Sequence, residues 1–495
     1  MSVGAPPVLE ADDRTTPQIS KAVAWLTAAR TFNRVQSALK VVIVSRLITP
    51  ASYGEYAIVL LVLMAFETFT QTGFNDALVY DREPSQKALN TAWTAQILRS
   101  SVVALLLLLI APLLAPVARN HTVLRMVQVT ALQAFLIGFE NVGIVYFQKE
   151  LQFHKQFLYY LLTGTASLVT AVCFGIALHS AWALVFSSLA AVVSRVILSY
   201  ILHPYRPRLT LHRRSIASLF HFGKWMTANS ITTFLAQRMD QMILARFFST
   251  ALLGTYQMAN LMGLTLATET AAIASTLGFP LYVKLGAASE RSVSMFLSTL
   301  RLISCAIMPA AIFVAVSAPE LVPVLLGSRW HEVIGPLRIS AMAAAVLCLD
   351  SPWTPMFLSC GLARAEFART GVRTVMLGLT LFPLTLKFGA SGSATAMLIS
   401  IVSVTPTWFM GMRIVGIRAS TLARTIAPGL LMAVLVAAAT AIVRFGILRA
   451  IPSAASIVPL AAAAVTTAGI LGTALFVCLR HRDLLSALAP KEEAA

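Results

Sequence analysis

The sequence has few charged residues and no segment polar enough to form a water-soluble domain. Only 12% of its 495 residues are Asp, Glu, Lys or Arg, whereas 58% are hydrophobic. Soluble domains carry about 25% charged residues, roughly twice this fraction. The composition therefore excludes a water-soluble globular protein, because the apolar excess has to face lipid.

Motifs of catalysis and metal binding are also missing. There is no GxxxxGK[ST] loop, no HExxH and no glycine-rich dinucleotide fingerprint. The five cysteines are scattered without CxxC spacing, and the eight histidines lie mostly in predicted loops. We therefore expect no enzyme activity, no metal site, no cofactor and no ATP hydrolysis in this chain.

Acidic residues are scarce relative to basic ones, which gives a net charge of +18. The basic residues are not gathered on one polar domain, as nucleic-acid binding would favour, but lie between apolar runs. This is the positive-inside pattern of a protein with many transmembrane spans, and it also suits anionic lipid head groups. We expect membrane lipids, and no nucleic acid, among its partners.

Long apolar runs are abundant and predict the fold class. A helix needs about 20 apolar residues to cross about 30 Å of hydrocarbon. By this criterion the chain contains about fourteen candidate spans, including two close together at 370–388 and 392–412. We predict an all-α, polytopic membrane protein.

Two short segments recur in the second half of the chain. RLITPASYGEY (46–56) matches RFFSTALLGTY (246–256) at four positions, and APLLAPV (111–117) matches APELVPV (318–324) at five of seven. Both pairs are offset by six spans, an even number, so the copies share one orientation. This repeat predicts two parallel six-helix bundles with the substrate site between them, plus two C-terminal helices. Chance is the alternative for such short matches.

Within the first pair, Gly54 and Gly254 occupy the same position. We expect both glycines in the turns between spans, where a left-handed backbone conformation favours this residue.

Lys and Arg in the connections indicate the orientation. Most lie on the side that holds the N-terminus, so both termini should be cytoplasmic. Residues 204–218 interleave basic and apolar side chains, which fits either an amphipathic helix on the inner leaflet or a solvated loop. The predicted parts are a cytoplasmic tail (1–20), a first bundle (21–203), a linker (204–218), a second bundle (219–415), two additional helices (416–482) and a second tail (483–495).

Three segments are typical of one family: SRLITPASYGEYAIV (45–59), RMDQMILARFFSTALLGTYQMA (238–259) and LGSRWHEVIGPLRI (326–339). The order and spacing of such segments over residues 20–420 resemble those of the polysaccharide-transporter branch of the multidrug/oligosaccharidyl-lipid/polysaccharide exporter superfamily. The resemblance implies fourteen helices, two lobes and a cationic cavity. It also implies that an undecaprenyl-diphosphate-linked repeat unit is moved to the outer leaflet of the bacterial cytoplasmic (inner) membrane.

The resemblance therefore implies a flippase of lipid-linked oligosaccharide for exopolysaccharide or O-antigen assembly, acting by alternating access. H⁺ or Na⁺ and other polysaccharide-assembly proteins are candidate partners. A peptidoglycan-precursor flippase or a drug/cation antiporter on the same scaffold are the alternatives. A polysaccharide polymerase or ligase is disfavoured, because the connections are too short to carry a catalytic domain.

Basic residues inside the apolar spans are candidate substrate contacts, because a charge at the bilayer centre costs about 2.5–3.5 kcal/mol and normally faces protein or water. Arg30 and Arg34 share one helix face, and a guanidinium suits phosphate oxygens. If the first helix instead begins near Val35, both lie at the cytoplasmic interface. Arg238 and Lys224 are the other candidate diphosphate contacts, although Lys224 could also reach the membrane surface.

Acidic residues inside the spans are candidate cavity or ion-coupling groups. Glu140 and Asp350 occupy equivalent places in the proposed repeat. Glu67 lies in the second span and Glu269 in the eighth, and these two spans are also equivalent in the repeat. Asp240 lies in one of the family-like segments. A buried carboxylate can bind a proton or, with carbonyl oxygens, Na⁺. A structural hydrogen bond or ion pair is the alternative role for these acids.

Overall fold

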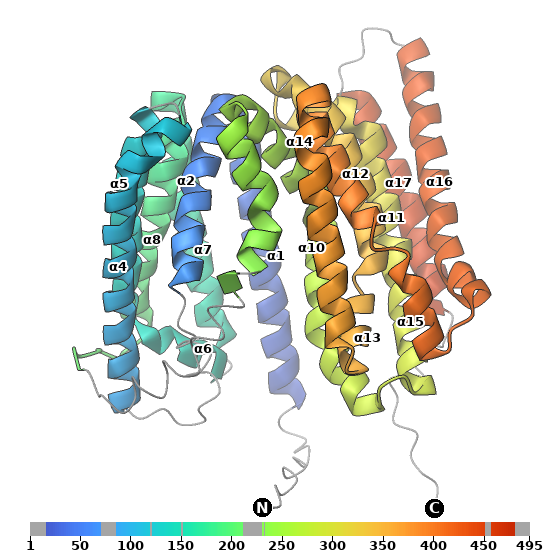
Figure 1. Ribbon diagram of the computed structural model, residues 1–495, viewed down its shortest axis with the longest axis horizontal. Coiled ribbons are helices and arrows are strands. Elements are labelled where there is room, and N and C mark those ends of the chain that lie inside the picture. The colour runs from blue at the N-terminus through green and yellow to red at the C-terminus, as the bar shows by residue number, and fades with distance from the viewer. Residues whose placement is uncertain are drawn as a thin grey trace, which may run out of the picture. The chain divides into compact units, whose positions relative to one another are not determined.

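The computed structural model describes residues 16–70, 86–118, 121–149, 152–210, 230–231, 233–450 and 457–480. Within these ranges every regular element is a helix (Figure 1), so the all-α prediction is confirmed. In chain order the elements are α1 (Thr16–Leu47), α2 (Pro50–Phe69), α4 (Gln86–Ala118), α5 (His121–Leu136), η1 (Ile137–Phe139), η2 (Val142–Ile144), α6 (Val145–Lys149), α7 (Phe153–Leu178), α8 (Trp182–Leu202), α10 (Thr250–Leu285), α11 (Glu290–Leu325), η3 (Ser328–Val333), α12 (Ile334–Asp350), α13 (Trp353–Ser359), α14 (Ala363–Val402), α15 (Thr407–Val415), α16 (Ala419–Ala450) and α17 (Ile457–Arg480).

Nine helical segments in the described ranges are long and apolar enough to cross a membrane. Their outward faces carry large apolar side chains, such as Leu109, Leu379 and Ile442, that are more than half exposed. Such side chains are stable in contact with lipid and not with water. The chain is a multi-pass membrane protein, and the number of fourteen spans stays a prediction.

Helix α14 is a helical hairpin. The backbone at Gly389 is non-helical, with φ 59° and ψ −139°. Leu381 and Ala396 belong to one buried cluster, although fifteen residues of straight helix would separate them by about 22 Å. The hydroxyls of Thr385 and Ser393 lie 2.9 Å apart across the same reversal. The chain therefore turns back between the two spans predicted at 370–388 and 392–412.

The chain divides into two compact units. The first comprises residues 1–48 and 55–235, and the second comprises 49–54 and 236–495. In the first unit α7 packs on α1 and α8, and α4 packs on α5. In the second unit α12 packs on α10 and α11, and α16 packs on α11 and α17. The predicted linker, 204–218, lies partly outside the described residues.

The two glycines matched by the repeat lie in the first turns of α2 and α10, in segments that both belong to the second unit. A Cβ added to Gly54 would lie 1.8 Å from the Thr250 carbonyl oxygen, and one added to Gly254 would lie 1.9 Å from the Pro50 carbonyl oxygen. Neither glycine has a positive φ. The prediction of a turn conformation is therefore wrong, and glycine is needed here because two helices cross in reciprocal backbone contact.

Candidate functional site

A polar cavity of about 390 Å³ lies within the first unit, between α1, α7 and α8. Such a volume is within the range of small-molecule binding sites. Its lining contains amides, hydroxyls and two cationic side chains, and no carboxylate. The lining residues are Asn33, Gln36, Ser37 and Lys40 of α1, Tyr160, Thr163, Gly164 and Ser167 of α7, and Ala191 and Arg195 of α8.

The side of the cavity formed by α1 is one polar helix face. Asn33, Gln36, Ser37 and Lys40 follow the spacing i, i+3, i+4 and i+7, which places them in one stripe. The Nζ of Lys40 donates a hydrogen bond to Ser167 Oγ at 3.2 Å. In the part of the chain that the structure describes, no carboxylate forms an ion pair with Lys40. Its charge is therefore available to an anion in the cavity.

Gln36 is held in place by α7. Its Nε2 donates to Thr165 Oγ1 at 2.7 Å and to the Leu161 carbonyl at 3.3 Å. Its Oε1 is buried and has no hydrogen-bond partner among the described residues. Gly164 makes room for this oxygen, because a Cβ there would lie 2.1 Å from it. A buried polar atom without a partner is uncommon in native proteins and is suited to meet a ligand donor or a water.

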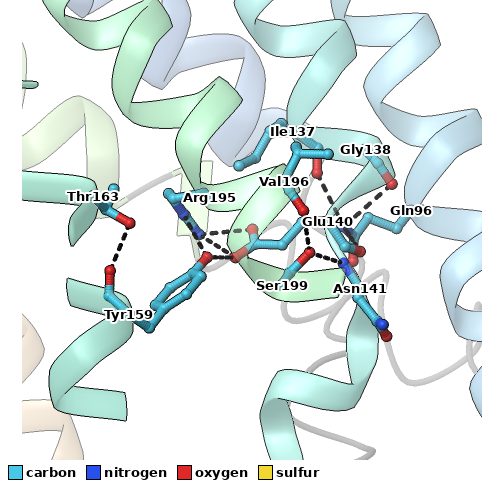
Figure 2. Close-up of polar contacts among 10 residues, drawn as sticks. All are labelled: Gln96, Ile137, Gly138, Glu140, Asn141, Tyr159, Thr163, Arg195, Val196 and Ser199. Carbon is cyan, nitrogen blue, oxygen red and sulfur yellow. Dashed lines mark hydrogen bonds and ion pairs between the residues drawn. The ribbon is translucent and has the colours of Figure 1, made fainter. Parts of the chain in front are cut away.

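Arg195 is fixed on the far side of the cavity by an ion pair and by a tyrosine (Figure 2). Its Nη2 lies 2.8 Å from Glu140 Oε2 and 3.1 Å from Oε1, and its Nε donates to the Tyr159 hydroxyl at 3.3 Å. Tyr159 in turn donates its O–H to Glu140. The three groups form a closed triangle contributed by α8, α7 and the segment after η1.

Glu140 is positioned by the break in helical structure that follows α5 and η1. The apolar span that begins at His121 ends at Phe139, and Glu140 follows the short helix η1. The side-chain Nε2 of Gln96 donates to the carbonyls of Ile137, Gly138 and Glu140 at 3.1–3.4 Å, and Ser199 Oγ accepts from the Asn141 N–H at 3.0 Å. These bonds replace those that the interrupted helix loses, which an apolar environment requires.

Further charges join this cluster from α2 and α4. Glu67 interacts electrostatically with Arg99 and Arg195. Together with Lys40 and Glu140, the first unit thus has three cations against two carboxylates in and beside the cavity. We call Lys40, Glu67, Arg99, Glu140 and Arg195 the first-unit cluster. Its net charge is positive.

A corresponding cluster lies in the second unit, around Asp350 at the end of α12. Its carboxylate accepts from Arg369 of α14 and, at 2.8 Å, from the indole N–H of Trp408. Arg369 is also paired with Glu366 at 2.9 Å. Tyr159 follows Glu140 by 19 residues, and Arg369 follows Asp350 by the same 19. We call Asp350, Glu366, Arg369 and Trp408 the second-unit cluster.

A profile of the family described as "polysaccharide biosynthesis protein" matches residues 43–335, more than half of the chain. The chain belongs to this family. The match runs from the end of α1 to the first residues of α12, so it includes Glu67, Arg99, Glu140 and Arg195 of the first-unit cluster. Lys40 and the second-unit cluster lie outside it. The resemblance seen in the sequence is confirmed at this level.

Curated relatives agree with this family. The lipopolysaccharide biosynthesis protein WzxC of Escherichia coli (strain K12) is 22% identical over 63% of this chain and 64% of its own length, slightly under two thirds. The succinoglycan biosynthesis transport protein ExoT of Rhizobium meliloti (strain 1021) is 20% identical over 72% of each chain. By name, WzxC is a lipopolysaccharide biosynthesis protein and ExoT is a transport protein of succinoglycan biosynthesis.

Solved structures show the same fold. The lipid II flippase MurJ in an inward closed conformation superposes with a TM-score of 0.69, at 10% identity, over 94% of this chain and all of its own. An inward-facing multidrug resistance MATE transporter of the MOP superfamily superposes with a TM-score of 0.60, at 15% identity, over 82% of this chain. At identities this low, the similarities establish the fold of this protein and nothing more.

The structure brings together some of the predicted site residues. Glu140 and Glu67 belong to the first-unit cluster, and Asp350 belongs to the second. Asp240 is buried and accepts a hydrogen bond from Tyr256 at 2.7 Å. The predicted ion-coupling roles of these acids stay predictions.

The other predicted residues lie elsewhere. The side chains of Arg30 and Lys224 lie outside the described residues, and Arg34 is exposed and does not line the cavity. Arg238 and Glu269 are half-buried in the second unit.

The predicted site residues did not include Lys40, Arg99, Arg195 or Tyr159. The regular spacing of Lys40 from Asn33 and Gln36 could have revealed it, because this spacing continues the polar stripe of α1. For Tyr159 the sequence holds no comparable signal.

Proposed function

We propose that this protein flips undecaprenyl-diphosphate-linked oligosaccharide repeat units from the inner to the outer leaflet of the bacterial cytoplasmic membrane, by alternating access. The observation that carries the proposal is the polar cavity lined by Lys40 and Arg195, inside a family member of polysaccharide biosynthesis. In this proposal the cavity receives the diphosphate and its first sugar, while the polyprenyl chain stays in lipid.

The charge balance of the cavity supports a diphosphate ligand. Lys40 has no carboxylate partner in the described ranges, and an unpaired cation among apolar helices is costly unless an anion neutralises it. Arg195 adds a forked donor, which fits phosphate oxygens, and ammonium and guanidinium groups both form strong charge-assisted hydrogen bonds. The neutral residues of the lining, such as Asn33, Ser37 and Thr163, are suitable partners for sugar hydroxyls.

The orientation of the protein in the membrane, its partners and its energy source are part of the same proposal. We place both termini in the cytoplasm and expect sugar-transferring and polymerising proteins to supply and consume the substrate. An H⁺ or Na⁺ gradient, or the membrane potential acting on the anion, would drive the movement. No nucleotide-binding motif in the sequence offers another source of energy.

The proposal is tested by neutralising the cavity cations in cells that depend on this gene for surface polysaccharide. We expect Lys40→Gln and Arg195→Gln each to lower export at least about tenfold, a loss of about 1.4 kcal/mol in substrate stabilisation. Lys40→Arg should keep most of the export, because the charge is retained. Lys387→Gln, which removes an exposed cation of α14, is the matched control and should leave export unchanged.

Equal export by the wild type and both glutamine variants, at equal protein levels, would overturn the role of the cavity. Vesicles containing the purified protein then decide the substrate. Flipping of a lipid-linked peptidoglycan precursor, or transport of a cationic drug, at a higher rate than a lipid-linked oligosaccharide repeat unit would favour the alternative functions.

A further inference from the structure

Arg195 faces two partners at once. It lines the cavity and is also the cation that neutralises Glu140. Its side chain is 41% exposed, whereas that of Glu140 is only 14% exposed. Its hydrogen bonds to described residues use Nε and Nη2, so Nη1 is left for a group in the cavity. A guanidinium has five N–H donors, so it can begin to bind a second anion before it releases the first.

We propose that an anion in the cavity competes with Glu140 for Arg195, so that binding of the diphosphate is coupled to uptake of a proton by Glu140. This inference rests on the proposed function, because it takes the diphosphate as the cavity ligand. The proton is supplied by the buffered aqueous solution and forms the neutral carboxylic acid of Glu140. No covalent bond is made or broken in the substrate.

The first step follows from charge. While the cavity is empty, the Glu140 carboxylate has Arg195 as its cation and the Tyr159 O–H as its second donor. A diphosphate carries more charge than a carboxylate and offers more oxygens to the same guanidinium. As the guanidinium turns towards the diphosphate, Glu140 keeps only the neutral tyrosine donor. A largely buried carboxylate without a cation is more stable in its protonated form.

The neighbouring charges do not replace Arg195. From α4, Arg99 interacts with Glu67 of α2, and Gln96 donates only to backbone carbonyls of the break. From α7, Tyr159 contributes a neutral donor. Lys40 of α1 is bonded to Ser167 and lines the cavity, where the diphosphate would attract it as well. Glu67 is the one other carboxylate of the first-unit cluster and so the rival proton acceptor.

The second unit contains a closely similar ion pair that does not line the first-unit cavity. Glu320 of α11 pairs with Arg444 of α16 at 2.7 Å, with side chains 11% and 37% exposed. The corresponding values for Glu140 and Arg195 are 2.8 Å, 14% and 41%. Arg444 is not among the residues that line the first-unit cavity. Glu320→Gln therefore breaks an equivalent ion pair without touching the proposed coupling.

The test is calorimetry of the full chain in lipid nanodiscs, with farnesyl diphosphate as the probe. Titrations in two buffers of different ionisation enthalpy give the number of protons taken up on binding. We expect net proton uptake by the wild type and by Glu320→Gln. Glu140→Gln should abolish the uptake and bind the probe several-fold more tightly, because the competitor for Arg195 has lost its charge. Ionisation of the probe itself is common to all variants, so it cancels in their difference.

The dependence of affinity on pH gives a second readout. Linkage of one proton to binding tightens the affinity by up to about tenfold for each pH unit of acidification. We expect this slope, measured relative to Glu140→Gln, in the wild type. If Glu140→Gln does not accumulate, Tyr159→Phe replaces it. Without the Tyr159 O–H, the protonated form of Glu140 should be still more favourable once Arg195 has turned to the diphosphate. The pH at which tight binding begins should therefore be higher than in the wild type.

Three results would overturn the inference: binding without proton uptake in the wild type, uptake that persists in Glu140→Gln, or uptake that disappears in Glu67→Gln alone. In each case lipid-linked oligosaccharide is still flipped, so the proposed function survives. Failure of the wild type to bind the probe, together with normal export by Lys40→Gln, would instead overturn both.

Discussion

Glu140 in the first unit and Asp350 in the second hold corresponding places, and each accepts a hydrogen bond from the residue 19 positions further along the chain. In the first unit that residue is a tyrosine, and the cation comes from α8. In the second unit it is Arg369, and the group from the later helix is the indole of Trp408. The helix that supplies the cation therefore differs between the two units: it is α8 in the first and α14 in the second.

This change decides which cluster is accessible. Arg195 is 41% exposed and lines a cavity, whereas Arg369 is 4% exposed and is enclosed by two carboxylates and the ring of Phe357. A buried ion pair whose cation is fully enclosed can only hold helices together. An ion pair whose cation faces a cavity can exchange its partner. The two units therefore differ in one respect: the cation is enclosed in the second and faces a cavity in the first.

The largest expected effect is on stability, from removal of the enclosed cation. Arg369→Met removes the ion-pair partner of buried Asp350 and half-buried Glu366, and breaking a buried pair typically costs about 3–5 kcal/mol. We expect a large fall in the amount of folded protein and in the thermal unfolding temperature in detergent. Arg195→Met should lower that temperature much less, because its pair is partly exposed, while it abolishes export. Equal losses of stability would contradict the distinction between the two clusters.

The general architecture could be predicted from the sequence, because apolar runs of about 20 residues and the recurrence of short segments do not depend on tertiary contacts. The correspondence of Glu140 and Asp350 was predictable for the same reason. Their partners were not, since an ion pair across helices depends on the rotation of each helix about its own axis. Arg195 is an example: it lies inside an apolar span, yet only the packing of α8 on α7 turns it towards Glu140.

The helix breaks differ in how visible they are. In the second unit Pro352 lies two residues after Asp350, and proline interrupts a helix by removing an N–H donor. In the first unit the break around Glu140 has no proline, and it is stabilised from outside by Gln96 and Ser199. The sequence therefore gives a local signal for one break and none of equal strength for the other.

A smaller effect is expected from adding a methyl group at a helix contact in each unit. At Gly164 a Cβ would meet the end of the Gln36 side chain, which can rotate away. At Gly429 a Cβ would lie 2.6 Å from the backbone of Ser304, which cannot. Gly429→Ala should therefore cost about 1–3 kcal/mol of stability, as overpacking usually does. Gly164→Ala should cost less than about 1 kcal/mol and instead lower export several-fold, because Gln36 is displaced into the cavity. Unfolding temperature and export, measured on the same two variants, separate these outcomes.

The smallest expected effect comes from single neutral donors to the two acids. Trp408→Phe keeps a ring against Trp353 but removes the indole N–H that donates to Asp350 at 2.8 Å. A hydrogen bond to a charged group contributes about 1.5–3 kcal/mol, but Arg369 remains as a second donor, so we expect a loss well below this range. Export per folded molecule should not change, because the second-unit cluster is enclosed. Tyr159→Phe removes the equivalent neutral donor from Glu140, and here we expect altered export with little loss of stability. If Trp408→Phe changed export per molecule as much as Tyr159→Phe does, the second-unit cluster would have to take part in transport as well.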